Sequence, residues 1–187
     1  MSKLFYGTTK ELIPNETKKI DEEIVNLANK VNPKFLFIGT ASKENENYYM
    51  TMKKIYEDLG CTVSKLELLK EKVELEYVRN QILKSDIVYV GGGNTRFMLE
   101  KWHELGVDKM LIEAYNKDIV LVGISAGSYC WFKYNYELIE GLGLIQAINC
   151  AHYDEKSEEQ KEKFYSVVKE TGLPRNCIRE LYCFRDS

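Results

Sequence analysis

Short runs of apolar residues alternate along the chain with segments whose apolar residues recur every three or four positions. Continuous apolar runs typical of buried strands cover residues 35–38, 87–90 and 119–122, and residues 62–69 alternate as a strand does. Helical spacing covers about residues 20–31, 48–59, 75–83, 95–116 and 157–171. This alternation predicts an α/β fold in which a mainly parallel sheet is covered by helices on both faces.

Capping residues mark the ends of several predicted helices. Asn15 precedes the first helical segment and can cap it. Gly60 follows the second segment and can end it. Ser157 and Gln160 have capping-box spacing at the start of the last one. Before the first helix, residues 3–6 form a short apolar start.

Glycine-containing turns follow two of the apolar strands. The strand at 87–90 runs into Gly91-Gly92-Gly93-Asn94-Thr95, and the strand at 119–122 runs into Gly123-Ile124-Ser125-Ala126-Gly127. Ligands of parallel sheets bind beyond the carboxyl ends of the strands. We therefore expect the two turns to line one crevice.

The second turn has the Gly-x-Ser-x-Gly pattern of an exposed nucleophile. Small residues on either side of Ser125 allow a sharp turn between a strand and a helix. The turn presents the serine hydroxyl at the positive end of that helix. The apolar residues 129–132 then supply the expected helix, so we interpret Ser125 as a nucleophile.

A serine hydroxyl needs a base at neutral pH, and the chain has two histidines. His103 lies in a helical pattern among charged residues, which is typical of a helix surface. His152 follows an apolar segment at a predicted strand end, where a purely structural histidine is the alternative. With Ser125 upstream, we prefer His152 as the base.

The triple-glycine turn is a candidate oxyanion hole. A backbone N–H of Gly92 or Gly93 can point at the developing oxyanion, with the N–H of Ala126 as the second donor. One alternative is a plain strand-to-helix turn capped by Asn94. A phosphate-binding loop is another, although the lysine and hydroxyl residue that should follow the glycines are absent.

Composition narrows the classes of function. A chain of 187 residues suits one domain, and its net charge of −3 disfavours nucleic acid as a partner. The five cysteines have no metal-binding spacing and suggest reduced thiols in a cytoplasmic protein. No apolar run is long enough for a secretion signal or a membrane span.

Together the motifs resemble the peptidase E family. The resemblance spans roughly residues 3–173 and rests on 90–95, 123–128 and the Gly141-Leu142-Gly143-Leu144-Ile145 segment leading to His152-Tyr153. It implies a serine peptidase on a three-layer, class I glutamine amidotransferase-like (flavodoxin-like) fold. It also implies Ser125 as nucleophile, His152 as base, and Gly92, Gly93, Asn94 and Ala126 around the oxyanion and substrate.

This chain differs from the family in the residues that would select the substrate. Its best-known members cleave dipeptides with an N-terminal aspartate, and a relative, cyanophycinase, cleaves an aspartate–arginine polymer. Members that select aspartate use an arginine downstream of the histidine, whereas no arginine occurs here between His152 and Arg175. Lys156, Lys161 and Lys163 do not offer the two-pronged hydrogen bonding of an arginine. The sequence therefore leaves open whether an N-terminal aspartate is preferred.

The C-terminal segment 175–187 is atypical. The family continues with a Gly-Ile-Ala-Leu-(Asp/Glu)-Asn-like strand whose acid is a candidate triad member. With suitable codons, a one-base frame change over 175–187 regenerates Gly-Ile-Ala-Leu-Glu-Asn, so we hypothesise a frame-shifted end. The usual triad acid is then missing from this chain, and Glu180 or Asp186 could substitute for it. Asp154 is instead expected to cap or solvate the helix that follows it.

The sequence therefore predicts a cytoplasmic, single-domain, dipeptidase E-like serine hydrolase. Its expected partner is a small peptide, and no nucleic acid or membrane partner is expected. We expect no metal or organic cofactor. A homodimer is left open. The main alternative is a non-catalytic relative that binds small molecules. A cysteine amidotransferase is disfavoured because the turn carries serine and Cys130 falls a turn or more into the following helix.

Overall fold

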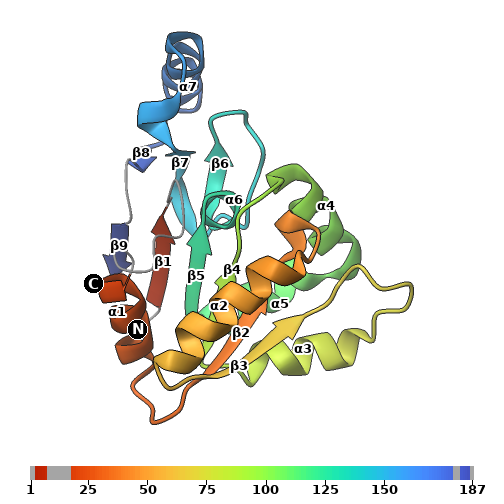
Figure 1. The fold of residues 1–187 in the computed structure, drawn as a ribbon. Coiled ribbons are helices and arrows are strands. Elements are labelled where there is room, and N and C mark those ends of the chain that lie inside the picture. The colour runs from red at the N-terminus through yellow and green to blue at the C-terminus, as the bar shows by residue number, and fades with distance from the viewer. Residues whose placement is uncertain (1–2, 8–17, 179–181, 186–187) are drawn as a thin grey trace.

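The computed structural model of the chain describes residues 3–7, 18–178 and 182–185. Helices cover both faces of its larger sheet (Figure 1). The larger sheet has the order β3-β2-β4-β5-β1-β9, in which all neighbours are parallel except β1 and β9. Its strands are β1 (Lys3–Gly7), β2 (Lys34–Ile38), β3 (Thr62–Leu66), β4 (Ile87–Val90), β5 (Val120–Ile124) and β9 (Tyr182–Arg185).

A smaller parallel sheet stands beside the larger one, and the sequence predicted only its strand that ends before His152. It has the order β6-β7-β8, with β6 (Phe132–Asn135), β7 (Ile145–Ala151) and β8 (Arg175–Ile178). The helices are α1 (Lys18–Ala28), α2 (Glu46–Asp58), α3 (Leu75–Leu83), α4 (Thr95–Leu105), α5 (Val107–Asn116), α6 (Ala126–Tyr129) and α7 (Glu158–Thr171). The 3₁₀ turns η1 (Thr40–Ser42) and η2 (Tyr153–Glu155) complete the described elements.

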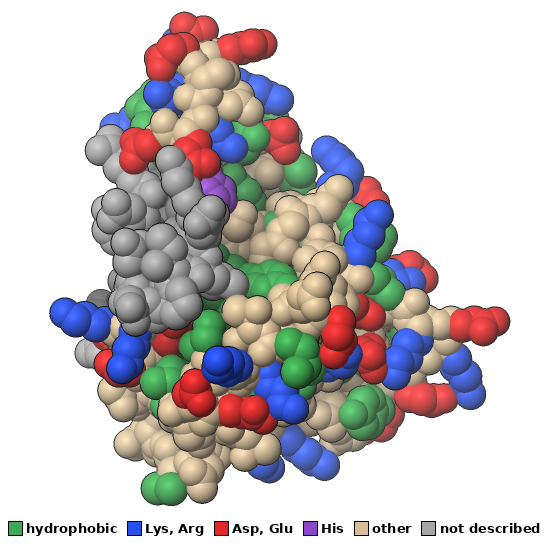
Figure 2. All heavy atoms as spheres, viewed as in Figure 1, with side chains coloured by type: hydrophobic (Ala, Val, Ile, Leu, Met, Phe, Trp, Pro, Cys, Tyr) green, Lys and Arg blue, Asp and Glu red, His purple; other side chains and the backbone are tan. Residues whose placement is uncertain are grey.

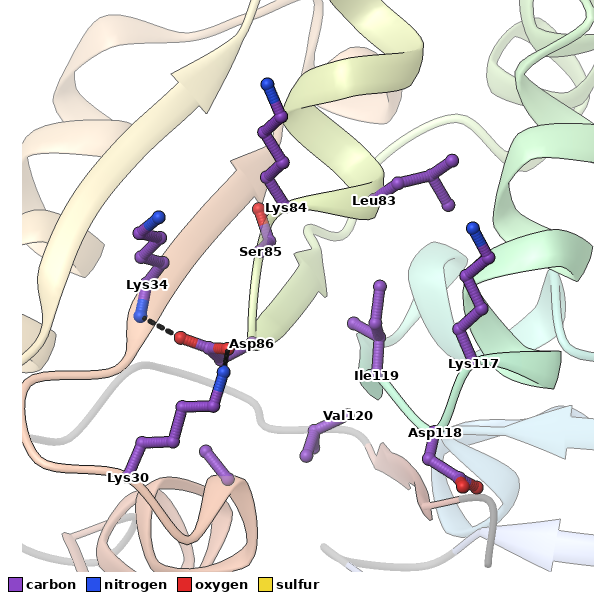
Figure 3. A pocket seen from close by; sticks show the side chains of 11 residues that line it. Lys30, Lys34, Leu83, Lys84, Ser85, Asp86, Lys117, Asp118, Ile119 and Val120 are labelled. Carbon is purple, nitrogen blue, oxygen red and sulfur yellow. Dashed lines mark hydrogen bonds and ion pairs between the residues drawn. The ribbon is translucent and has the colours of Figure 1, made fainter.

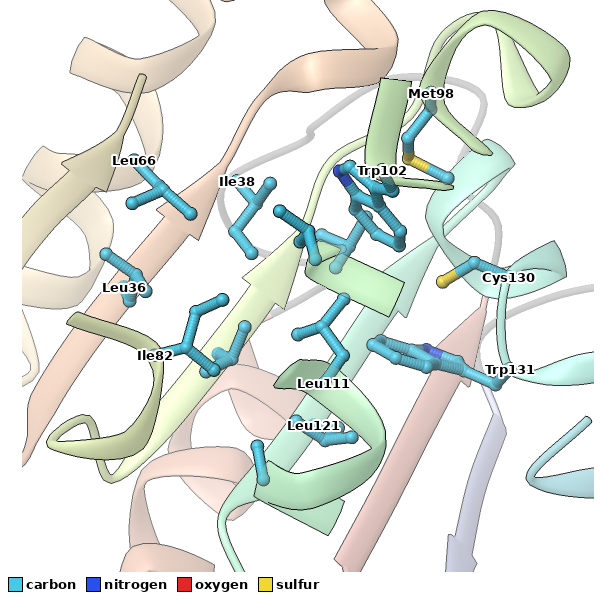
Figure 4. Packing of buried hydrophobic residues seen from close by; sticks show 14 of the residues in the cluster. Leu36, Ile38, Leu66, Ile82, Met98, Trp102, Leu111, Leu121, Cys130 and Trp131 are labelled. Atoms are coloured by element: carbon cyan, nitrogen blue, oxygen red, sulfur yellow. The ribbon is translucent and has the colours of Figure 1, made fainter. Parts of the chain in front are cut away.

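Alternate residues of the central strands supply two separate cores. On one face, Leu36, Val88 and Leu121 pack with residues of α3, α4 and α5, including Trp102 and Leu111 (Figure 4). On the other face, β2, β4 and β5 pack with residues of α1 and α2. The two helical layers hold the parallel sheet between them, so the α/β fold expected from the sequence is confirmed.

Most predicted elements appear within a few residues of their expected positions, but the predicted helix over 95–116 is two helices. Gly106 adopts φ 70° and ψ 16°, a left-handed conformation that ends α4 and starts α5 in a new direction. Asn15, the predicted cap of the first helix, lies outside the described residues.

The predicted helix through 129–132 is wrong. Helix α6 ends at Tyr129, and β6 begins at Phe132. The backbone carbonyls of Cys130 and Phe132 accept hydrogen bonds from the N–H groups of Leu142 and Gly143, at 2.6 and 3.2 Å. These partners lie more than ten residues downstream and replace the local bonds that a helix would make, so the apolar segment continues as a buried strand.

Within the described residues, no helix is both long enough and apolar enough to cross a membrane.

Candidate active site

Ser125 occupies a strained turn between β5 and α6. Its backbone has φ 52° and ψ −114°, a conformation that side chains other than glycine rarely adopt. A Cβ built on Gly123 would lie 2.1 Å from the carbonyl oxygen of Gly127, and one built on Gly127 would lie 2.2 Å from that of Val90. Both flanking glycines are therefore required by the close approach of backbone to backbone, as expected for a nucleophile elbow.

His152 follows the last residue of β7 and faces Ser125. Its Nε2 lies 3.0 Å from the Ser125 Oγ, although the two residues are separated by 27 positions in the chain. Its backbone is left-handed, with φ 56° and ψ 39°, which turns the chain sharply at the strand end. His103, in contrast, lies in the last turn of α4 with an 83% exposed side chain and pairs with Asp108. The structure thus brings together the predicted hydroxyl and imidazole.

Buried polar contacts that the sequence analysis missed join the elbow to the strand carrying His152. The Tyr129 hydroxyl accepts from the Ala151 N–H at 3.1 Å and lies 3.3 Å from the Ala151 carbonyl. Ser128 Oγ donates to the Ser125 carbonyl at 2.6 Å and accepts from Asn149 Nδ2 at 3.2 Å. These bonds link α6 to β7 on either side of the Ser125–His152 pair and fix its spacing.

The triple-glycine loop passes directly beside the Ser125 side chain. A Cβ on Gly92 would lie 3.2 Å from the Ser125 Cβ, and Gly93 adopts φ 141°, where a Cβ would overlap the backbone of Ala41. The N–H of Gly92 donates to the Tyr48 hydroxyl at 3.4 Å. Burial raises the pKa of Tyr48, and the hydrogen bond from Gly92 acts in the opposite direction.

Two N–H groups of this region have no hydrogen-bond partner in the described part of the chain. They belong to Gly93, in the loop, and to Ala126, the residue after Ser125. The Asn94 N–H, by comparison, donates to the Ala41 carbonyl at 2.8 Å, and the Asn94 side chain caps α4 by accepting from the Phe97 N–H. The capping role weighed for Asn94 is therefore present, and it leaves the N–H groups of Gly93 and Ala126 available to a ligand.

Ser125 and His152 open into a pocket of about 370 Å³. The surrounding face of the molecule is hollowed below α7, with a histidine side chain at the rim (Figure 2). The lining carries charges of both signs, from Arg96, Glu137 and Lys156. The Lys156 ammonium lies 4.6 Å from the centre of the Tyr136 ring. This pocket can accommodate a small polar ligand beside Ser125.

A larger hollow of about 510 Å³ lies at the amino-terminal ends of the central strands (Figure 3). Its carboxylate Asp86 accepts from the backbone N–H of Lys34 at 2.8 Å and from the Lys30 ammonium at 2.6 Å. Those contacts tie α1 and β2 to the start of β4. None of the predicted site residues lines this hollow, so the smaller pocket is the candidate site despite its size.

Cys130 does not have the environment of a nucleophile. Its side chain is fully buried behind the elbow, and its thiol donates to the Gly127 carbonyl at 2.9 Å. Burial holds the pKa of this thiol well above its ordinary value, so it stays protonated near neutral pH. It directly follows the short helix α6 rather than lying a turn inside a longer helix, which corrects the predicted position.

The atypical C-terminal segment is partly incorporated into the sheets. β8 pairs with β7 in parallel, and β9 pairs with β1 in the antiparallel sense. Glu180 and Asp186, the two acids considered as substitutes, lie outside the described residues. The frame-shift hypothesis stays a prediction, because only the nucleotide sequence tests it.

Comparisons with known proteins identify the family of this chain. A profile of peptidase family S51 matches residues 7–180. The chain belongs to this family, and the resemblance to peptidase E is confirmed.

Two relatives are described as uncharacterised peptidases. YgaJ of Bacillus subtilis strain 168 is 33% identical over 161 residues, covering 82% of this chain and 69% of the relative. Lmo0363 of Listeria monocytogenes serovar 1/2a (strain EGD-e) is 33% identical over 121 residues, covering 63% of this chain and 58% of the relative.

Two solved structures show the same fold. A candidate peptidase E from Listeria monocytogenes EGD-e covers the whole of both chains with a TM-score of 0.70 at 23% identity. A peptidase from an acI-B1 actinobacterium covers 87% of this chain and 75% of its own, with a TM-score of 0.70 at 18% identity.

Proposed function

We propose that this single-domain family S51 protein is a serine peptidase that hydrolyses small peptides at the pocket containing Ser125 and His152. The observation that carries the proposal is the 3.0 Å approach of His152 Nε2 to Ser125 Oγ at a strained strand-to-helix turn. A base at hydrogen-bond distance from a hydroxyl is the arrangement that activates a serine nucleophile.

Ser125 Oγ attacks the carbonyl carbon of the scissile peptide bond and transfers its proton to His152 Nε2. The carbonyl oxygen becomes an oxyanion that accepts hydrogen bonds from the unpartnered N–H groups of Gly93 and Ala126. We choose Gly93 over Gly92 because the Gly92 N–H donates to the Tyr48 hydroxyl. Gly92 leaves the space beside the serine open.

Collapse of the tetrahedral intermediate breaks the C–N bond, and His152 gives its proton to the departing amine. The remaining acyl group is an ester of Ser125. Water then attacks this ester while His152 Nε2 takes a water proton, and the second collapse returns the proton to Ser125 Oγ. No step requires a metal or organic cofactor.

The pocket supports a short, charged peptide as the substrate. Its volume of about 370 Å³ suits a dipeptide-sized ligand, and Lys156 and Arg96 can face a carboxylate while Glu137 can face an ammonium group. A cytoplasmic location and a peptide partner are part of this proposal. Hydrolysis of a dipeptide panel with acidic, basic and neutral N-terminal residues tests the substrate class.

Covalent labelling by a fluorophosphonate tests the nucleophile. We expect one adduct per chain on Ser125, lost in Ser125→Ala and retained in His103→Ala, because His103 is exposed and lies outside the pocket. Mass spectrometry of the intact protein and its peptides measures the adduct. Labelling that is unchanged in Ser125→Ala would falsify the assignment, and peptide binding without hydrolysis would favour the non-catalytic alternative.

A further inference from the structure

We propose that Glu155 is the positioning residue of His152, taking the place of the triad acid. This inference rests on the proposed function, because it concerns the base of the same site. Sequence reasoning considered Asp154, Glu180 and Asp186 for this region and did not consider Glu155.

The two nitrogens of the His152 ring face two different partners. Nε2 lies 3.0 Å from Ser125 Oγ, and Nδ1 lies 3.7 Å from Glu155 Oε1. The imidazole is therefore placed between a hydroxyl and a carboxylate, in the order that a catalytic triad requires. The contact to Glu155 has the distance of an ion pair, and the Glu155 side chain is 41% exposed.

The local backbone explains why the residue at i+3 reaches the ring. His152 is left-handed and is followed by the 3₁₀ turn η2, whose Glu155 N–H donates to the His152 carbonyl at 3.1 Å. This hydrogen bond closes the turn and brings residue 155 back beside residue 152.

Three other charged side chains face the pocket around His152. Arg96 comes from α4, Glu137 follows β6, and Lys156 directly follows Glu155. The Lys156 ammonium lies over the Tyr136 ring. The carboxylate of Glu155 contacts the imidazole from the turn that directly follows His152.

A carboxylate at Nδ1 has two effects on the proposed reaction. It accepts the Nδ1 proton of the neutral ring, so the lone pair of Nε2 faces Ser125. It also stabilises the imidazolium that forms when the serine proton is transferred. An amide at this position can instead donate to Nδ1 and favour the wrong tautomer.

The rate of fluorophosphonate labelling tests this role. We expect Glu155→Gln to lower the second-order rate constant by about 10- to 100-fold, less than the ~10⁴-fold effect of a fully buried triad acid, because Glu155 is partly exposed. Glu159→Gln removes an equal charge from the start of α7 and leaves this rate constant unchanged.

Nitrogen-15 NMR at alkaline pH gives a readout that does not depend on labelling. The chain has two histidines, and His103→Gln assigns the signals. We expect the Nδ1–H tautomer of His152 to predominate in the wild type and to lose population in Glu155→Gln. An unchanged tautomer and an unchanged labelling rate in that variant would overturn the inference while leaving Ser125 as the nucleophile.

Absence of labelling in the wild-type protein would instead contradict the proposed function. In that case the tautomer measurement still decides whether Glu155 orients the ring.

Discussion

The position of the Ser125 hydroxyl depends on close backbone packing around its turn. Its backbone conformation costs on the order of 1–3 kcal/mol for a residue with a side chain. The turn is held because Gly127 lies against the Val90 backbone of the neighbouring strand and Gly123 lies against Gly127. The strain of one residue is thus offset by close packing of residues that take no part in the chemistry.

Gly127→Ala tests this account. Its new methyl group would lie 2.2 Å from a backbone oxygen, which no side-chain rotation relieves, so we expect a loss of about 3 kcal/mol of stability and of labelling at Ser125. Gly172→Ala is the matched control, since it has a left-handed backbone but open space around it and should cost about 1 kcal/mol. Equal melting temperatures for wild type and Gly127→Ala would contradict the explanation.

At the scale of the elements, periodicity located most helices and the parallel strands of the larger sheet. It failed where distant backbone partners decide the structure. The apolar residues after Tyr129 look helical in isolation, yet the segment around Leu142 supplies hydrogen bonds that make them a strand. Gly106 likewise divides a continuous helical pattern that sequence spacing alone does not interrupt.

In the candidate site, too, some residues could be predicted from the sequence and others could not. Ser125 and His152 could be proposed because their residue types and flanking motifs are visible in the sequence. Glu155 and Tyr129 could not, because their relevance arises from a 3₁₀ turn and from a contact between α6 and β7. The sequence shows acidic residues after His152, but it does not show the contact of the Glu155 carboxylate with the imidazole, which the folded turn brings about.

Helix α7 provides a test at this scale. Its capping box joins Ser157 and Gln160, and its buried residues Phe164 and Val167 pack in the cluster that includes the end of β7. We expect Ser157→Ala to lower the free energy of unfolding by about 1 kcal/mol in urea denaturation. Ser166→Ala, at an exposed position in the middle of the same helix, should be neutral or slightly stabilising. A neutral Ser157→Ala would exclude the cap as a source of stability.

For the whole molecule, the active-site pair joins two sheets. Ser125 follows a strand of the larger sheet, and His152 follows a strand of the smaller one. Helix α6 lies between them and contacts β1, β5, β6 and β7. The geometry of the pair therefore depends on how the two sheets are held against each other, rather than on either sheet alone.

The edge of the larger sheet offers a final test. Strand β9 covers β1, which pairs Tyr6 with Gly123 and Gly7 with Ile124 just before the elbow. A chain ending at Ile178 lacks β9 and exposes the β1 edge, so we expect a lower melting temperature and concentration-dependent association in size-exclusion chromatography. Removing only residues 186–187, which follow β9, is the control. The monomeric fraction of the shortened chain should still label at Ser125, because Ser125, His152 and Glu155 all remain. Loss of labelling in a folded monomer would place the missing acid in the deleted segment instead.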